Sequence, residues 1–277
     1  MSVYQQARSV DAGGVSLNGL DMEIVVEKPK DDPLEFDITV WNLTDESWSR
    51  ISDGDLCRIE LGWEGGPLET VTLGEIDTLS RKGDGVDVEH TIAGLDETQA
   101  ATKVGAEPET FEDETPADIA ASLVSEVGLS AQTSYDGPPI QGTYAVTPDR
   151  QIAQWLDDLI QQAADLTGSE YEWYASRGQI IFQPRSGEAS SAPQLSYGGM
   201  LASIGEASDV DDDVEGQLEF DAALDPRIGK GTVLSVDVEG FSGAYRVSQF
   251  EMRSSTLSGD HEITGVLTPV DADYSIQ

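Results

Sequence analysis

Carboxylates are the most abundant side chains in this sequence that could do chemistry, with 53 Asp and Glu residues against 15 Lys and Arg. The densest acidic run, DVDDDVE at residues 209–215, offers the oxygen ligands that Ca²⁺ prefers. It lacks the glycine at the sixth position and the acid at the twelfth position of an EF-hand loop, so we interpret it as a solvated loop. Carboxylates are so frequent that no pair stands out as acid and base. We therefore expect no metal site and no catalytic carboxylate pair.

Histidine, cysteine and phosphate-binding motifs give no stronger signal. His90 and His261 are the only imidazoles, and neither has the HxxxH or HExxH spacing of a metal site. The sequence has no GxSxG elbow, no GxxxxGK[ST] loop and no GxGxxG after a strand, and Cys57 has no second cysteine to pair with. We expect no catalytic residue, no cofactor and no enzyme. A halophilic hydrolase with a site of scattered carboxylates is the alternative.

The net charge of −38 is spread along the whole chain rather than held in a tail. Such self-repulsion opposes folding in dilute buffer, whereas at molar salt the Debye length falls to about 3 Å and most of the repulsion is screened. This predicts a halophilic, haloarchaeal protein, with a mesophilic acidic protein as the alternative. Because Lys and Arg form no cluster, stable DNA binding is not expected.

Targeting and membrane signals are missing from the sequence. No apolar run reaches about 18 residues, and the first residues, MSVYQQARSV, lack the apolar core of a signal peptide. We therefore expect no membrane span and no Sec export, so that the chain is made and folds in the cytoplasm of its host.

Hydrophobic periodicity predicts a mainly β protein with an α+β middle. Residues 34–41 alternate apolar and polar side chains, which is the period of a half-buried strand. In the middle of the chain, Thr115-Pro116 and Thr147-Pro148 each place an N-cap and a proline at the start of a predicted helix. An aromatic hairpin around Tyr171 and Trp173 follows. It could form a sugar platform in a carbohydrate-binding adhesin, but packing on the helix is the preferred interpretation.

Two strand-rich sections enclose this middle part and have a similar layout. Ile51-x-x-Gly54-x-Leu56-x-x-Ile59 is echoed by Ile228-x-x-Gly231-x-Val233-x-x-Val236. We predict two small tube-like β-barrel or sandwich domains that bracket a helix-plus-hairpin domain. The predicted segments are an N-terminal arm (1–18), a first β-barrel domain (19–100), an α+β middle domain (101–190) and a second β-barrel domain (191–277).

The order of these parts resembles the baseplate or tail hub family of tailed viruses. The likeness covers roughly residues 20 to 270, and its single pieces carry little information on their own. The pieces are Ile38 to Leu43, Ile51 to Asp55, Gly62-Trp63, Gly74 to Ile76, Ala93 to Asp96, the two Thr-Pro helices, the run from 147 to 184, and Gly243 to Val247.

The resemblance implies a structural role in a virion. Hub chains of this family carry two tube-like barrels, and three chains form a ring of six barrels that closes the tail tube and adapts its sixfold symmetry to a threefold tip. The implied partners are a homotrimer, tail tube and distal tail proteins, a separate tip, spike or fibre protein, and a tape-measure protein. DNA would pass through the ring without stable binding. The implied location is the tail tip or baseplate, and a cellular tail-derived injection machine is a close alternative.

Overall fold

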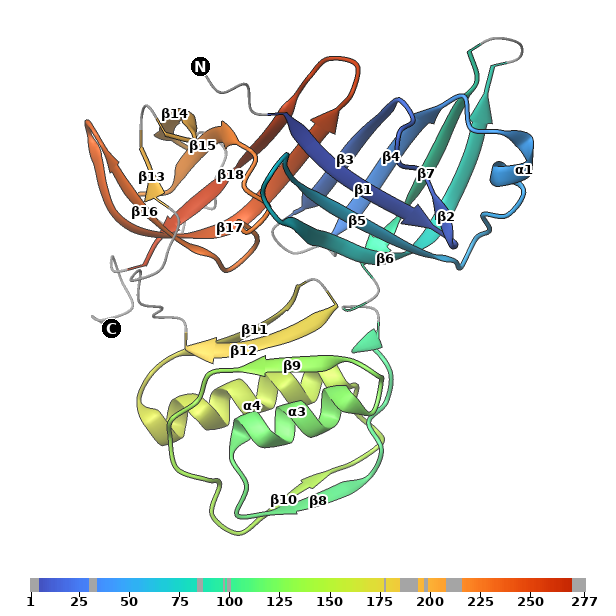
Figure 1. The fold of residues 1–277 in the computed structure, drawn as a ribbon. Helices are drawn as coiled ribbons and strands as arrows, with labels where there is room; N and C mark the ends of the chain where they lie inside the picture. Colours follow the sequence, from blue (N-terminus) through green and yellow to red (C-terminus); the bar gives the residue numbers. More distant parts are fainter. Residues whose placement is uncertain are drawn as a thin grey trace. The chain divides into compact units, whose positions relative to one another are not determined.

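The computed structural model describes residues 5–29, 34–83, 87–96, 98, 101–176, 178–184, 194–196, 199–207 and 216–270. The chain forms two compact units, Met1–Asp96 with Ala189–Pro269 and Glu97–Glu188 with Val270–Gln277 (Figure 1). Strands predominate, and the two long helices belong to the second unit. The prediction of a mainly β protein with an α+β middle is confirmed. The acidic run 209–215 lies outside the described residues.

The first unit contains two repeats of one strand order, which differ in that β1 is antiparallel to β5 whereas β13 is parallel to β16. In the first repeat the hydrogen-bonded order is β3-β4-β7-β6-β5-β1, and in the second it is β14-β15-β18-β17-β16-β13. The first repeat comprises β1 (Gln6–Ala12), β2 (Val15–Ser16), β3 (Met22–Lys28), β4 (Glu35–Trp41), the short helix α1 (Asp45–Trp48), β5 (Leu56–Trp63), β6 (Leu68–Lys82) and β7 (Glu89–Asp96). The second comprises β13 (Gln194–Leu195), β14 (Leu201–Glu206), β15 (Leu218–Ala223), β16 (Val233–Val238), β17 (Phe241–Ser255) and β18 (His261–Pro269).

The echo between residues 51–59 and 228–236 corresponds to the same backbone geometry in both repeats. Gly54 N donates to Ile76 O at 2.8 Å and Ile76 N donates to Asp55 O at 2.9 Å. In the second repeat, Gly231 N donates to Val247 O and Val247 N donates to Thr232 O, both at 2.9 Å. Gly54 and Gly231 have φ angles of 85° and 82°, a conformation that glycine adopts without strain. Pairing order and turn geometry therefore both support an internal duplication.

The expectation of an N-terminal arm is wrong for residues 6–16. Strand β1 pairs with β5 from Gln6↔Trp63 to Ala12↔Cys57, and β2 turns back onto β1. Val10 and Ala12 are fully buried, although their neighbours in sequence are polar. Two short apolar side chains gave too weak an alternation to identify the strand, and the partner β5 supplies the backbone hydrogen bonds that stabilise it.

One strand pair joins the two repeats into a continuous sheet. The second half of β17 pairs antiparallel with β3, from Phe250↔Lys28 to Ser255↔Glu23. Buried side chains of both repeats form one hydrophobic core, which includes Ile24 and Met252 on the paired strands.

The second unit packs two helices against a three-stranded sheet. Helix α3 (Pro116–Ser125) has the predicted cap, since Asp118 N donates to Thr115 Oγ1 at 3.1 Å. Helix α4 (Ile152–Thr167) ends as predicted at Gly168. The strands are β8 (Glu109–Glu112), which pairs with β10 (Thr143–Val146), and β9 (Ser130–Thr133), β11 (Tyr171–Ser176) and β12 (Gln179–Pro184) in the order β11-β12-β9.

Helix α4 begins later than its Thr147-Pro148 signal predicts. Residues 148–150 form a turn, and Gln151 is the N-cap, with reciprocal bonding between Gln151 and Gln154. Ile152 N donates to Val104 O at 3.0 Å, a contact with a distant segment that fixes the start of the helix. Across the described residues, no helix has the length and apolar character needed to cross a membrane.

Candidate functional site

Strand alternation gives the joined sheet of the first unit one strongly acidic surface. On β15, β18, β17, β3 and β4, every second side chain points into the core, as Phe220, Met252 and Ile24 do. The residues between them point to the other side, and we call this side the acidic face. It comprises Glu219, Asp221, Glu262, Glu251, Arg253, Glu23, Glu27, Glu35 and Asp37.

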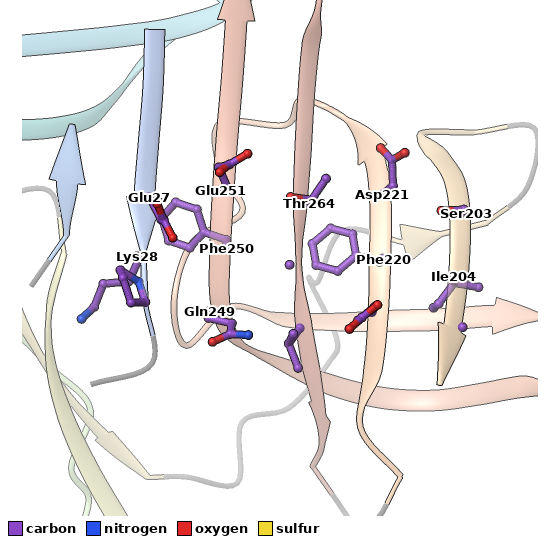
Figure 2. Close-up of a pocket in the computed structure, with 15 residues that line it drawn as sticks. Glu27, Lys28, Ser203, Ile204, Phe220, Asp221, Gln249, Phe250, Glu251 and Thr264 are labelled. Carbon is purple, nitrogen blue, oxygen red and sulfur yellow. The ribbon is translucent and has the colours of Figure 1, made fainter. Parts of the chain in front are cut away.

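The strand register brings carboxylates of the acidic face opposite one another. Asp221 is paired with Thr264, Thr264 with Glu251, Glu251 with Glu27, and Glu27 with Glu35. Figure 2 shows the first four of these residues in a row across neighbouring strands. Directly opposed side chains have Cβ atoms about 4.5–5.5 Å apart, and like charges at this separation are destabilising. The row therefore costs stability wherever salt does not screen it.

Burial, and to a lesser degree this crowding, raises the pKa of two carboxyl groups on the acidic face. Burial, and next the charge of Glu23, raises the pKa of Asp37. Burial, and next the charges of Asp221 and Asp260, raises the pKa of Glu262. Arg253 offsets part of the charge: its Nε lies 2.5 Å from Glu251 Oε1, and this hydrogen bond raises the pKa of the guanidinium. The face as a whole stays negative and favours no anionic ligand.

Each repeat has a shallow hollow on this face, and its lining includes a glycine and the core-facing phenylalanine that is paired with it. Gly265 is paired with Phe220 on the next strand, and Gly94 is paired with Phe36 in the same way. A Cβ atom on Gly265 would lie 2.9 Å from Phe220 Cε1, and one on Gly94 would lie 2.7 Å from Phe36 Cζ. The hollows have volumes of about 650 and 480 Å³. A repeated Phe–Gly contact is thus a further trace of the duplication.

The two histidines lie in different repeats and form no common site. His90 is fully buried beside Trp48, with ring centroids 4.7 Å apart. His261 is 7% exposed and contacts Trp63, with ring centroids 4.5 Å apart. Both pKa values are lowered, mainly by burial, so both rings are neutral at pH 7. These surroundings agree with the interpretation of both histidines as packed structural residues.

Cys57 and the aromatic hairpin, the remaining candidates from the sequence, are packed in the interior or against a helix. Burial raises the pKa of the Cys57 thiol to about 12, which leaves it protonated and unreactive. Tyr171 is buried against the helices of the second unit, and Trp173 Nε1 donates to Asp157 Oδ1 on α4 at 2.7 Å. The aromatic hairpin thus packs on the helix, which is the interpretation that the sequence analysis preferred to a sugar platform. Among the described residues, no group of three or more His, Cys, Asp or Glu side chains is arranged to hold a metal.

Sequence reasoning did not find the acidic face. The alternation of Glu35 and Asp37 with apolar residues on one strand was visible, but it does not tell which carboxylates lie on the strands beside it. The register of β17 on β3, which joins segments more than two hundred residues apart, supplies that information.

Solved structures with the same fold are tail proteins. The 43 kDa tail protein of prophage MuSo2 from Shewanella oneidensis aligns with a TM-score of 0.68 and 13% identity over 96% of this chain and 98% of that chain. A tail protein from Neisseria meningitidis aligns with a TM-score of 0.68 and 13% identity over 98% of both chains. The chain has a tail-protein fold.

A third structure extends this fold to a secretion machine. An E. coli component of the type VI secretion system, which is structurally similar to T4 bacteriophage tail proteins, aligns with a TM-score of 0.61 and 10% identity over 94% of this chain and 76% of that chain. No protein-family model and no curated protein matches the sequence. The three structures bear the names of tail or secretion components, and this chain shares their fold.

Proposed function

We propose that this chain is a tail hub protein that acts as a homotrimer. Three chains with two repeats each form a ring of six similar barrels, which docks on a sixfold tail tube and presents threefold symmetry to the tip. The observation that carries the proposal is the duplicated strand order within one continuous sheet, because a chain of two equivalent repeats is what converts threefold into sixfold symmetry. The tail-protein fold of the chain supports it.

The joined sheet has edges suited to closing such a ring. From one repeat to the other, the order β14-β15-β18-β17-β3-β4-β7-β6 is antiparallel at every step. An even number of strands makes β14 and β6 run in opposite directions, so that β14 of one chain can add to β6 of the next in the same antiparallel manner. The second half of β6, beyond its pairing with β5, and the outer side of β14 are the expected contact edges.

In this ring the acidic face lines the channel through which the genome passes. Phosphates that meet carboxylates and few cations find no binding site on the wall, so DNA moves through without stable binding. The partners in this proposal are tail tube and distal tail proteins, a separate tip, spike or fibre protein and a tape-measure protein, and the location is the tail tip or baseplate of a virion.

The environment that we propose for the hub is a salt-rich one, in a haloarchaeal tailed virus. The acidic face alone does not account for a net charge of −38, since acidic residues occur along the whole sequence. At molar salt the Debye length of about 3 Å is shorter than the spacing between carboxylates of neighbouring strands, so that crowded rows become tolerable.

Light scattering after size exclusion tests the proposal, in multimolar and in low salt. The expected result in high salt is a trimer of three times 29.7 kDa, which dissociates or unfolds as salt is withdrawn. If the chain remains a monomer in high salt even after addition of its tip protein, the hub proposal is overturned. A monomer that is equally well folded in dilute buffer also removes the argument for a halophilic source.

Proline substitutions in the edge strand β14 test the contact itself. Ile204 and Gly205 direct their N–H groups to opposite sides of the strand. One of I204P and G205P therefore blocks only the open edge, whereas the other breaks a bond to β15 and lowers stability. We expect the stable variant to be a folded monomer, and a trimer in that variant would exclude β14 as a contact edge.

A further inference from the structure

Among the described residues, the two repeats of the first unit are attached by a strand ladder, by a buried cluster and by hydrogen bonds from the Gln6 side chain to Gly259 O and Asp260 O. The first is the antiparallel ladder between β17 and β3. A ladder between two strands is a line of attachment, and strand pairs vary widely in their twist. Two curled sheets joined only along this line can change the angle between them. A fixed angle requires a second attachment that lies off the line.

The second attachment is a cluster of five residues, Gly62, Trp63, Leu224, Ser254 and His261, on the core side of the sheet. Glu262 and Arg253 point to the acidic face, so alternation directs His261 and Ser254 to the opposite side, where both are buried. Gly62 and Trp63 belong to β5 of the first repeat, whereas the other three residues belong to the second repeat.

The hydrogen bonds of this cluster determine both the orientation and the tautomer of the His261 ring. Nε2 of His261 lies 2.8 Å from Gly62 O, and Nδ1 lies 2.9 Å from Ser254 Oγ. A carbonyl only accepts, so Nε2 carries the proton and donates to Gly62, and Nδ1 accepts from the Ser254 hydroxyl. Both ring nitrogens are thus used by a neutral imidazole.

Trp63 closes the cluster from the other repeat. Its Nε1 donates to Leu224 O at 2.8 Å, and its ring meets the His261 ring edge to face at 4.5 Å between centroids. One repeat therefore supplies a carbonyl acceptor to His261, and the other supplies a carbonyl acceptor to Trp63. Such a reciprocal pair of bonds, one buried and one part-buried, defines both distance and orientation.

We propose that Trp63 and His261 are positioning residues that set the angle between the two repeats, and thereby decide whether six barrels close into a ring. The second half of this inference rests on the proposed hub function, whereas the first half does not. Ring closure depends on this angle because each chain of a symmetric ring has the same angle, so that any deviation from the closing value adds up around the ring.

Distances between two spin labels in one chain test the angle directly. Glu46 in α1 and Glu239 in the turn between β16 and β17 are exposed, lie in different repeats and accept cysteine without loss of a described hydrogen bond. The buried Cys57 thiol, with a pKa of about 12, stays unlabelled under native conditions. Dilution with unlabelled chain keeps labels of different chains apart. The original sequence is expected to give a single narrow distance peak.

Two variants of the cluster and one matched control complete the experiment. H261A removes the ring, and W63F keeps the aromatic bulk but loses the bond to Leu224 O. Trp48 contacts His90 in a comparable Trp–His pair that lies within the first repeat alone, so W48F is the control. We expect loss of the narrow peak in H261A and W63F and its retention in W48F. A narrow, unshifted peak in W63F, which is the variant more certain to fold, overturns the proposal.

Light scattering on the same samples separates this proposal from the hub function. A trimer in the original sequence and in W48F, with monomers in H261A and W63F, supports both halves of the inference. Trimers in all four proteins, despite broadened distances, overturn the link to ring closure. If the original sequence itself is a monomer in high salt with its tip protein present, the hub proposal fails, while the distance peaks still decide whether the cluster sets the angle.

Discussion

A fall in pH from about 7 to about 5 is expected to destabilise the first unit through His261. Burial lowers the pKa of this ring from its ordinary value of 6.5 to about 4; the bond to Gly62 O opposes the shift, and the nearby charge of Arg8 adds to it. In the unfolded chain the ring takes up a proton below pH 6.5, whereas in the folded protein it stays neutral. The unfolded state therefore binds more protons in this window, and stability decreases as the pH falls.

The size of the effect follows from the two pKa values. With 6.5 unfolded and about 4 folded, proton linkage gives a loss of about 2 kcal/mol between pH 7 and pH 5. The loss begins near pH 6.5 and levels off below pH 4, where both states are protonated. The ring is 7% exposed, so solvent screening does not reduce this figure much. Carboxylates with raised pKa values, such as Glu262, have the opposite effect: the folded state binds more protons at these groups, so they increase stability as the pH falls.

The assay isolates His261 from the carboxylates by comparison with H261Q. Glutamine can still donate to Gly62 O and accept from Ser254, but it does not titrate. Urea unfolding of both proteins at constant high salt, followed by far-UV circular dichroism, gives the free energy of unfolding at each pH. The difference between the two proteins is expected to change by about 2 kcal/mol between pH 7 and pH 5.

Two results would refute the reasoning. If the stabilities of the original protein and H261Q change in parallel over this range, His261 does not hold its neutral state in the folded protein. An NMR titration of the two histidine rings gives an independent answer, since a His261 midpoint near 6.5 would contradict the buried, doubly bonded ring.

Three further predictions concern the hollows, the acidic face and a helix cap. G265A is expected to lower the free energy of unfolding by about 1–3 kcal/mol, because its Cβ would lie 2.5 Å from a backbone oxygen, whereas G205A, with open space around it, stays near neutral in urea unfolding. E27Q is expected to raise stability by up to about 1 kcal/mol in low salt and to have little effect in molar salt, in contrast to E239Q in an exposed turn. T115A removes the cap of α3 and is expected to cost the second unit about 1 kcal/mol, measured by hydrogen exchange of its helices.

Each of these predictions has a result that contradicts it. Equal stability of G265A and G205A would mean that the strand beside Gly265 yields to the added methyl group without cost. An equal gain in E27Q at low and at high salt would exclude charge repulsion as its cause. Unchanged hydrogen exchange of α3 in T115A would mean that the Thr115 cap does not stabilise the helix.

The sequence by itself determined the order and type of the main elements. Alternation in residues 34–41 identified β4, and the capping threonine with its proline identified α3, because both signals depend on residues close together in the chain. The echo between residues 51–59 and 228–236 predicted a duplication, since a glycine with positive φ between apolar strands is a local requirement of the turn. The expectation that no residue is catalytic stays a prediction.

Only the tertiary structure decided how the strands combine. Period-two alternation tells which side chains share a face of a strand, but it does not name the neighbouring strand, and so neither the acidic face nor β1 could be located from the pattern. The start of α4 was likewise set by a backbone bond to Val104 rather than by its Thr-Pro signal. His261 was an isolated histidine in the sequence, and its role became visible through Gly62, 199 positions away. Interactions at such separations depend on packing, which local patterns do not encode.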